Sequence, residues 1–239
     1  GNGSNPRTLT GVGFQPDFVW QKNRTDSNGH TLADAIRGAN KTLSSDGTGA
    51  EVTDKSDGHL DAFTSDGFTV GAGSSSDARV NDGSHTYVAW NWKANGAGSS
   101  NSDGSITSTV SVNTTAGFSI VKWTGTNSNG TIGHGLGTTP SLFISKSMAG
   151  SHAWGVYHKS IGIGSTTLLN SNGASDADAT YYGGTSPTST IMGLGTANAT
   201  NASGNMIGYA FAEKKGYSKF GSYTGNGNAD GTFVYTGFR

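Results

Sequence analysis

The stretches GFQPDFVWQK (Gly13–Lys22) and GTTPSLFISK (Gly137–Lys146) carry Gly, Pro and Lys at matching positions, 124 residues apart. A second matched pair, VAWNW (Val88–Trp92) and IGYAF (Ile207–Phe211), follows in the same order and alternates bulky apolar side chains with small or polar ones. Alternation with a period of two is typical of a half-buried β-strand. Because self-similarity in a fixed order indicates a repeated structural unit, the sequence predicts two copies of one β-rich unit.

Turn dipeptides separate the predicted strands. Asn-Gly or Asp-Gly occurs twelve times in the 239 residues, and both pairs favour the positive φ angles of tight hairpin turns. Their spacing leaves room for two short strands and a connection between successive turns. The only helix-like pattern is LADAIR (Leu32–Arg37), which ends at Gly38. We therefore expect an all-β protein with short antiparallel strands and at most one short helix.

The composition is unusual for a soluble protein. Gly, Ser, Thr and Asn together make up about half of the chain, and only 13% of the residues are charged, against about a quarter in typical domains. Only two residues are Glu, and long apolar runs are missing, which excludes a helical bundle and a buried parallel sheet. Aromatic side chains, 10% of the chain, can supply the core area instead. We expect four tryptophans on strand faces to be buried in that core: Trp20, Trp90, Trp92 and Trp123.

Charge and cysteine content exclude several classes of partner. The net charge is −1 and no basic stripe occurs, so phosphate neutralisation of a nucleic acid is not expected. The chain contains no Cys, which excludes disulfides and thiolate metal sites. No apolar run approaches the roughly 18 residues that a membrane helix needs. We therefore expect no nucleic-acid partner and no membrane insertion.

Domain boundaries follow from a linker and from a third, incomplete copy. The Gly-, Ser- and Asn-rich residues 94–105 are typical of a flexible linker. The stretch GFSIVKWTG (Gly117–Gly125) resembles GYSKFGSYTG (Gly216–Gly225) with one extra residue, and the last fifteen residues align with the first fifteen. We predict a first β-sandwich repeat over 1–98 and a second over 99–216. Residues 217–239 then either start a third repeat, as in a slice of a longer repeat protein, or form terminal strands exchanged with a neighbouring molecule.

Catalytic and metal-binding patterns were not found. A glycoside hydrolase needs two carboxylates across a cleft, whereas the Asp residues lie mostly in turn dipeptides. No Gly-x-Ser-x-Gly motif occurs between a strand and a helix. Two Asp clusters, one formed by Asp54, Asp57 and Asp61 and the other by Asp176 and Asp178, do not fit the EF-hand spacing. We predict no enzyme activity, no cofactor and no metal site, with a loop-bound calcium left open.

One polar stretch is a candidate ligand site. Tyr181 and Tyr182 lie next to each other before two glycines, with Asp176 and Asp178 close by. Exposed aromatic rings stack on sugar faces while carboxylates and amides hold the hydroxyl groups. We therefore name Tyr181, Tyr182, Asp176 and Asp178 as candidate ligand-binding residues. The alternative is that the tyrosines belong to a short, partly buried strand.

Several motifs resemble a known repeat. GFQPDFVWQKNR (Gly13–Arg24), AIRG (Ala35–Gly38), FTSDGF (Phe63–Phe68) and YVAWNWK (Tyr87–Lys93), together with the second-copy stretch Asn113–Gly125, are similar to repeats in structural proteins of marine bacteriophages. The resemblance covers nearly the whole chain. It implies a concanavalin-like or lectin-like β-sandwich, with a jelly-roll as the related option, inside a virion or tail-fibre-like protein. It brings no catalytic motif with it.

Three functions are compatible with these observations. The first is a non-enzymatic virion structural or adhesion module, part of a tail fibre, spike or surface appendage of a phage, built from tandem β-sandwich repeats. The second is a carbohydrate-binding lectin-like domain, and the third is a subunit of an extracellular filament joined by strand exchange. The expected partners are other copies of the chain, neighbouring repeats or virion proteins, and a host-surface glycan. The expected location is the virion or the extracellular space.

Overall fold

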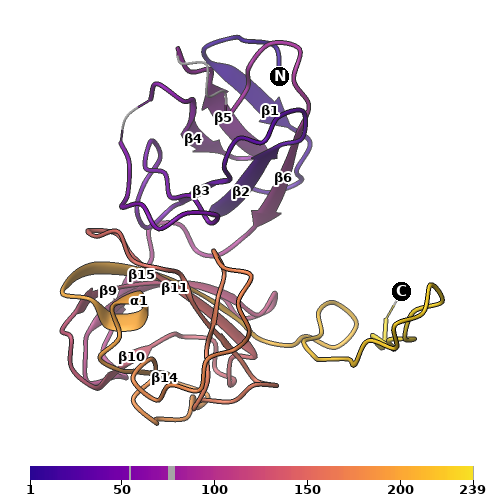
Figure 1. Ribbon diagram of the computed structural model, residues 1–239. Coiled ribbons are helices and arrows are strands. Elements are labelled where there is room, and N and C mark those ends of the chain that lie inside the picture. The colour runs from indigo at the N-terminus through magenta and orange to yellow at the C-terminus, as the bar shows by residue number, and fades with distance from the viewer. Residues whose placement is uncertain (54, 75–78, 239) are drawn as a thin grey trace.

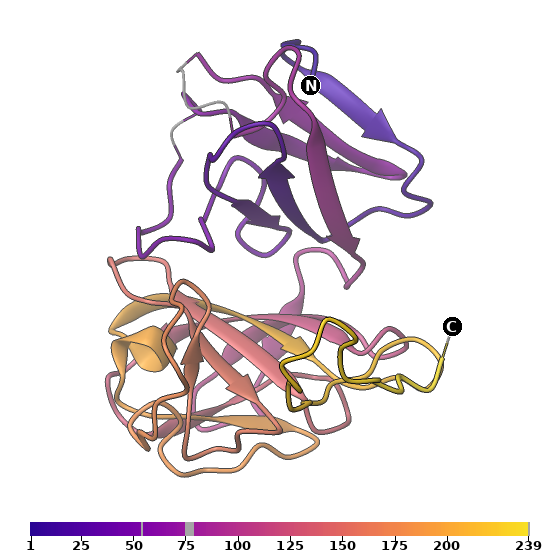
Figure 2. The same ribbon diagram turned by 45° about the vertical axis from the view of Figure 1, so that its right-hand side comes forward.

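The chain is all-β, as the sequence predicts (Figure 1). The computed structural model describes residues 1–53, 55–74 and 79–238. Four antiparallel sheets and one very short helix account for the regular structure of these residues. The first part of the chain, in indigo and purple, lies above the remainder in both views (Figure 2).

Residues before position 94 form two three-stranded sheets. The first has the order β1-β5-β4, with β1 at Arg7–Thr10, β5 at Gly67–Gly71 and β4 at His59–Thr64. The second has the order β3-β2-β6, with β3 at Thr31–Asp34, β2 at Phe18–Asn23 and β6 at Tyr87–Trp92. A cluster of buried apolar side chains from both sheets lies between them: Val19, Ala33, Leu60, Phe68, Val70 and Val80.

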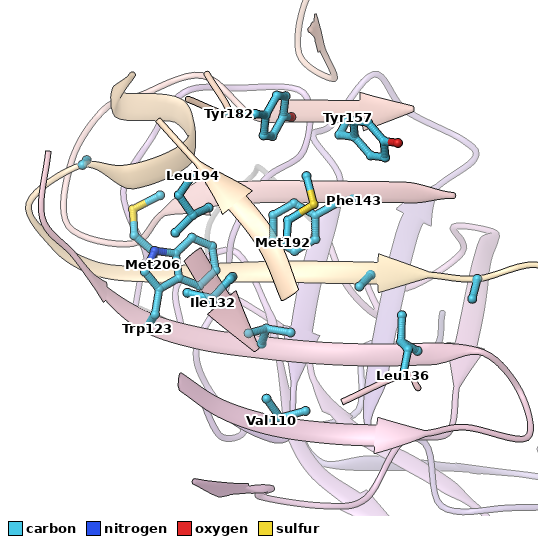
Figure 3. Close-up of a cluster of buried hydrophobic side chains, with 14 residues drawn as sticks. Val110, Trp123, Ile132, Leu136, Phe143, Tyr157, Tyr182, Met192, Leu194 and Met206 are labelled. Carbon is cyan, nitrogen blue, oxygen red and sulfur yellow. The ribbon is translucent and has the colours of Figure 1, made fainter. Parts of the chain in front are cut away.

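The later residues form a seven-stranded and a two-stranded sheet. The large sheet has the order β13-β12-β11-β15-β9-β8-β7. Its strands are β7 (Ser99–Asn101), β8 (Ser108–Asn113), β9 (Phe118–Gly125), β11 (Leu142–Ser147), β12 (Gly155–His158), β13 (Thr167–Leu168) and β15 (Gly204–Phe211). The small sheet pairs β10 (Gly130–Gly133) with β14 (Ile191–Leu194). Figure 3 shows the core between the two sheets, where Trp123 and Met206 face Ile132 and Leu194.

A third apolar cluster joins the two parts of the chain. It lies between β2 and β3 on one side and β9, β11, β12 and β15 on the other. Phe18 stacks on Tyr209 with ring centroids 4.3 Å apart, and the Trp154 indole N–H donates to the Ser44 carbonyl at 2.9 Å. The sheets therefore follow one another in layers, and the seven-stranded sheet is covered on both faces.

A buried polar network crosses the same boundary. The Tyr209 hydroxyl donates to Oδ2 of Asp34 at 2.8 Å, and the Arg37 guanidinium binds the same carboxylate and Glu51. Although burial opposes its charge, the attraction of Asp34 raises the pKa of Arg37 above its usual value. A buried ion pair is tolerated when its remaining polar atoms are hydrogen-bonded, and Arg37 also donates to the carbonyls of Leu32 and Lys41.

Five strands of the first part have counterparts in the second. The order β3-β2-β6 reappears as β12-β11-β15, and the pair β1–β5 reappears as β10–β14. Side-chain contacts repeat as well: Lys22 donates to the carbonyl of Asp26, and Lys146 donates to the carbonyl of Gly150, 124 residues later. The correspondence is partial, because β4 in the first part and β8 and β9 in the second have no counterpart strand among the described residues.

The predicted helix at Leu32–Arg37 is wrong. Residues Thr31–Asp34 form strand β3, which pairs with β2. The backbone N–H of Arg37 binds the Asp34 side chain, and that of Gly38 binds the Asp34 carbonyl, so only one turn follows the strand. The one helix of the described residues is α1 (Asn198–Asn201). No strand occurs among the described residues after Phe211, although Lys214 and Ser218 form an isolated bridge.

Candidate functional site

The two adjacent tyrosines that the sequence analysis expects to be exposed, Tyr181 and Tyr182, differ in burial. Tyr182 is 0% exposed and belongs to the core between the seven-stranded and two-stranded sheets. Its ring meets that of Tyr157 edge-on at 5.8 Å (Figure 3). The apolar surroundings raise the pKa of Tyr182 well above its usual value. The ring of Tyr182 therefore offers no face to a ligand, which corrects the expectation of an exposed pair.

The other three predicted residues lie nearer the surface. Asp176 pairs through its backbone with Thr166, and Oδ1 of Asp178 accepts the Thr180 backbone N–H at 2.8 Å. Contacts with Thr180 lower the pKa of Asp178. The half-buried ring of Tyr181 lies 6.4 Å from that of Tyr182. Asp178 thus shapes a turn, and ligand binding by Asp176, Asp178 and Tyr181 stays a prediction.

Two members of the aspartate cluster of the first part, Asp57 and Asp61, contact basic side chains. Asp54 lies outside the described residues. Asp61 accepts a hydrogen bond from Nε2 of His59 at 2.7 Å, and Asp57 pairs with Arg79 at 3.5 Å. Within residues 1–53, 55–74 and 79–238, no group of three His, Asp or Glu side chains is placed to hold a metal ion.

An aromatic groove lies where the two parts of the chain meet. It has a volume of about 480 Å³ and is lined by side chains from β2, β6, β9, β11, β15 and the segment after β15. Six aromatic residues line it: Trp20, Trp92, Phe118, Phe211, Tyr217 and Phe220. Phe118 and Phe211 lie 5.0 Å apart between ring centroids, and Phe211 lies 6.4 Å from Phe220. The sequence analysis missed this groove because its walls come from distant stretches.

The chemistry of the groove is apolar. None of its lining side chains is charged. Its volume falls within the range of roughly 300–1,000 Å³ that is common for small-molecule sites. At its edge, the Trp20 indole N–H donates to Nδ1 of His30 at 2.7 Å, and burial lowers the pKa of His30. A flat uncharged group, such as a sugar face or an aromatic side chain, is the ligand that such walls favour.

Exposed apolar side chains gather in the tail, residues 213–238, which extends away from the second part of the chain (Figure 1). Among the described residues, six of the eight large exposed apolar side chains belong to the tail: Tyr217, Tyr223, Phe233, Val234, Tyr235 and Phe238. The other two are Val52 and Trp90. Trp90 is 45% exposed, so the prediction of four core tryptophans is wrong for this one.

Fold and site together define an all-β protein of stacked antiparallel sheets with an apolar groove and an aromatic tail. No helix in the described part of the chain is long and apolar enough to span a bilayer. The model of a family described as a domain of unknown function, DUF7483, matches residues 1–239, and the chain belongs to this family. No curated protein and no solved structure matches the chain.

Proposed function

We propose that this chain is a non-enzymatic structural or adhesion module of a phage virion, part of a tail fibre, spike or surface appendage. In this proposal the chain consists of two tandem β-sandwich repeats of the concanavalin, lectin or jelly-roll type, over 1–98 and 99–216. Its location is the virion or the extracellular space, and its partners are copies of itself, neighbouring repeats or virion proteins.

One observation carries the proposal: the strand order β3-β2-β6 and the pair β1–β5 of the first part reappear in the second part as β12-β11-β15 and β10–β14. Duplicated units that bury a shared face form elongated, stiff objects in which each unit contacts its neighbours. The shared cluster around Phe18 and Tyr209 supplies such a face here. A low density of charge and a surface rich in Gly, Ser, Thr and Asn suit a spacer that presents loops.

Electron microscopy tests this function. Antibodies raised against the purified chain are applied to phage particles assembled in cells that carry the gene, and gold label is located by negative staining. We expect label on a fibre, a spike or the capsid surface. Label restricted to soluble protein, with unlabelled particles, would contradict the proposal.

The aromatic groove favours a second candidate, a carbohydrate-binding lectin-like module with a host-surface glycan as ligand. Stacking of sugar faces on Trp92 or Tyr217 is the physical basis. A glycan array probed with the full chain tests it, with Tyr217→Ala as the groove variant and Tyr235→Ala as the control, since Tyr235 does not line the groove. Glycan binding that is lost in Tyr217→Ala but kept in Tyr235→Ala would support the lectin function. If the parent chain binds no sugar at millimolar concentration, the lectin function is excluded.

A filament subunit joined by strand exchange is the third candidate. It is favoured by the exposed aromatic tail. Fibrils in negatively stained samples of the purified chain would support it, and monodisperse particles at all concentrations would exclude it.

A further inference from the structure

A histidine borders the aromatic groove. The ring of Trp20 forms part of the groove wall, and its indole N–H donates to Nδ1 of His30 at 2.7 Å. Because an indole nitrogen only donates, Nδ1 of His30 is the acceptor, and the imidazole is neutral with its proton on Nε2. The two rings meet edge-on at 71°, with their centroids 5.8 Å apart. The contact therefore requires the neutral form of His30.

The backbone of His30 is anchored on both sides of its Cα atom. Its N–H donates to Oδ1 of Asp46 at 2.9 Å, and its carbonyl accepts the Ser44 hydroxyl at 2.9 Å. The rings of His30 and Trp20 are both half-buried, and Trp90, which meets Trp20 edge-on at 6.3 Å, is 45% exposed. The core therefore does not enclose Trp20 on this side. A change of charge on His30 acts on the two side chains, while the backbone stays anchored.

In the second part of the chain, the two equivalent positions are apolar. The residues 124 positions after Trp20 and His30 are Ile144 and Trp154, and both are buried. The backbone anchor is nevertheless repeated, because the Trp154 N–H donates to Oδ1 of Asn170 at 2.8 Å. The same pairing of strands thus forms with two side chains that do not titrate. The fold therefore does not require a histidine at the groove.

Protonation of His30 is incompatible with its contact to Trp20. A proton on Nδ1 turns the acceptor into a donor, so that two N–H groups face each other at a nitrogen–nitrogen distance of 2.7 Å. Burial is the largest influence on the pKa of His30 and lowers it from 6.5; Lys22 on β2 lowers it further, and Asp46 on the segment after β3 opposes both. The contact is therefore intact at neutral pH and is lost under acidic conditions.

We propose that protonation of His30 releases Trp20 from the groove wall and so lowers the affinity of the groove for a flat, uncharged ligand. The described side chains that line the groove carry no charge, so a charged ligand would be buried there without a partner. Binding favours the neutral form of His30, so the affinity is complete above pH 6.5 and decreases as the pH falls through the pKa of His30. Regulation by His30 rests on the groove being a ligand site, as the carbohydrate-binding candidate also requires.

The indole N–H signal of Trp20 in a nitrogen–proton NMR spectrum reports the switch without any ligand. In the isotope-labelled full chain, this signal is identified by its absence in Trp20→Phe. We expect it to shift as the pH falls from 7.5 to 4.5, because its acceptor is lost. In His30→Asn, the amide oxygen takes the place of Nδ1 and gains no proton, so the shift should be absent. A Trp20 signal that stays constant in the parent chain, or moves equally in His30→Asn, would overturn the proposal.

Fluorescence titration with N-phenyl-1-naphthylamine, a flat uncharged aromatic probe, measures the affinity of the groove. Because only molecules with neutral His30 bind the probe fully, the dissociation constant of the parent chain should rise at least about threefold between pH 7.5 and 4.5. It should stay constant in His30→Asn, and also in Trp20→Phe, which keeps a ring but lacks the N–H donor. The matched control is His158→Asn. His158 lies 6.4 Å from Phe220 in the groove wall, and burial lowers its pKa as well, so this variant should keep the pH dependence of the parent.

The results separate a failure of the switch from a failure of the site. No binding of the probe at pH 7.5, or equal affinity in Tyr217→Ala, which changes a residue that lines the groove, would overturn the proposal together with the groove as a ligand site. Binding that does not depend on pH in the parent chain would overturn the proposal and leave the site in place. Loss of the pH dependence in His158→Asn rather than in His30→Asn would do the same. Circular dichroism at each pH will verify that every variant is folded.

Discussion

The substitutions Tyr209→Phe and Tyr182→Phe should have opposite effects on stability, although both remove one hydroxyl from a fully buried ring. The Tyr209 hydroxyl donates to the Asp34 carboxylate at 2.8 Å in the layer that joins the two parts of the chain. A hydrogen bond to a charged group contributes about 1.5–3 kcal/mol. We expect Tyr209→Phe to lower the free energy of unfolding by this amount.

The Tyr182 hydroxyl makes no hydrogen bond of good geometry in the described part of the chain, and its polar neighbour is the Thr166 hydroxyl. The nearby hydroxyl of Thr166 donates instead to the carbonyls of Val156 and Thr167, both at 3.1 Å. Because an unpaired buried hydroxyl costs free energy, its removal is neutral or stabilising. We expect Tyr182→Phe to change the free energy of unfolding by between zero and a gain of about 1 kcal/mol.

Urea denaturation followed by tryptophan fluorescence measures both effects at pH 7. For a chain of this length, each kcal/mol corresponds to a shift of roughly 2–4 °C in Tm, so calorimetry gives an independent value. A double-mutant cycle of Tyr209→Phe with Asp34→Asn isolates the pair. If both tyrosine variants lose the same stability, or the cycle shows no coupling, the hydroxyl of Tyr209 does not stabilise the boundary in the way we argue.

Three further outcomes follow from buried polar groups. His134 is buried, with Nε2 bound to the Thr188 carbonyl and Nδ1 accepting the Leu136 N–H, and burial lowers its pKa from 6.5. The stability that neutral His134 contributes is therefore complete above pH 6.5 and is lost as the pH falls. Urea midpoints should decrease from pH 7.5 to 5 in the parent chain, and less steeply in His134→Asn. Lys146→Met should cost about 2–4 kcal/mol at pH 7, because the carbonyls of Thr48, Ser147 and Gly150 lose their shared donor, whereas Lys22→Met should cost less, about 1 kcal/mol, since Lys22 is only half-buried and one of its acceptors, the Asp26 carbonyl, belongs to an exposed residue; equal losses in urea melts would disprove this. Asn201→Leu, which removes the contacts to Trp123, Thr126 and Ser128, should destabilise the chain by about 2–4 kcal/mol, and a calorimetric Tm within 2 °C of the parent would contradict that role.

Several strands were accessible to sequence analysis because matched stretches recur in the same order along the chain. Pro16 and Pro140 precede β2 and β11 at matching distances, and the alternation in Val88–Trp92 and Ile207–Phe211 identifies β6 and β15. A helix was predicted over Leu32–Arg37 because the local composition of this segment favours one. Tertiary contacts prevail there: Leu32 pairs with Leu43, and Asp34 binds Arg37 and Tyr209.

The candidate binding surfaces were harder to predict from the sequence than the strands, because they depend on how distant segments pack. The stretch Tyr181–Gly184 has two aromatic residues among polar ones, but the sequence alone does not reveal that the Tyr182 ring packs inward against Tyr157. The groove combines Trp20, Trp92 and Phe211, whose proximity depends on how the layers meet. A sequence pattern of period two identifies the two faces of a strand but does not say whether another layer covers each face.

Trp90 shows what the repeat adds to such a pattern. Its alternation predicts a buried face, and its counterpart Tyr209 is 1% exposed. The difference lies in the layer that covers each ring. Tyr209 stacks on Phe18 of the first part and donates to Asp34, whereas Trp90, on the last strand of the order β3-β2-β6, meets only the Trp20 ring edge-on at 6.3 Å among the aromatic rings of the described residues. A pattern of period two therefore identifies which side chains share a face, and the packing of the layers decides how far each of them is covered.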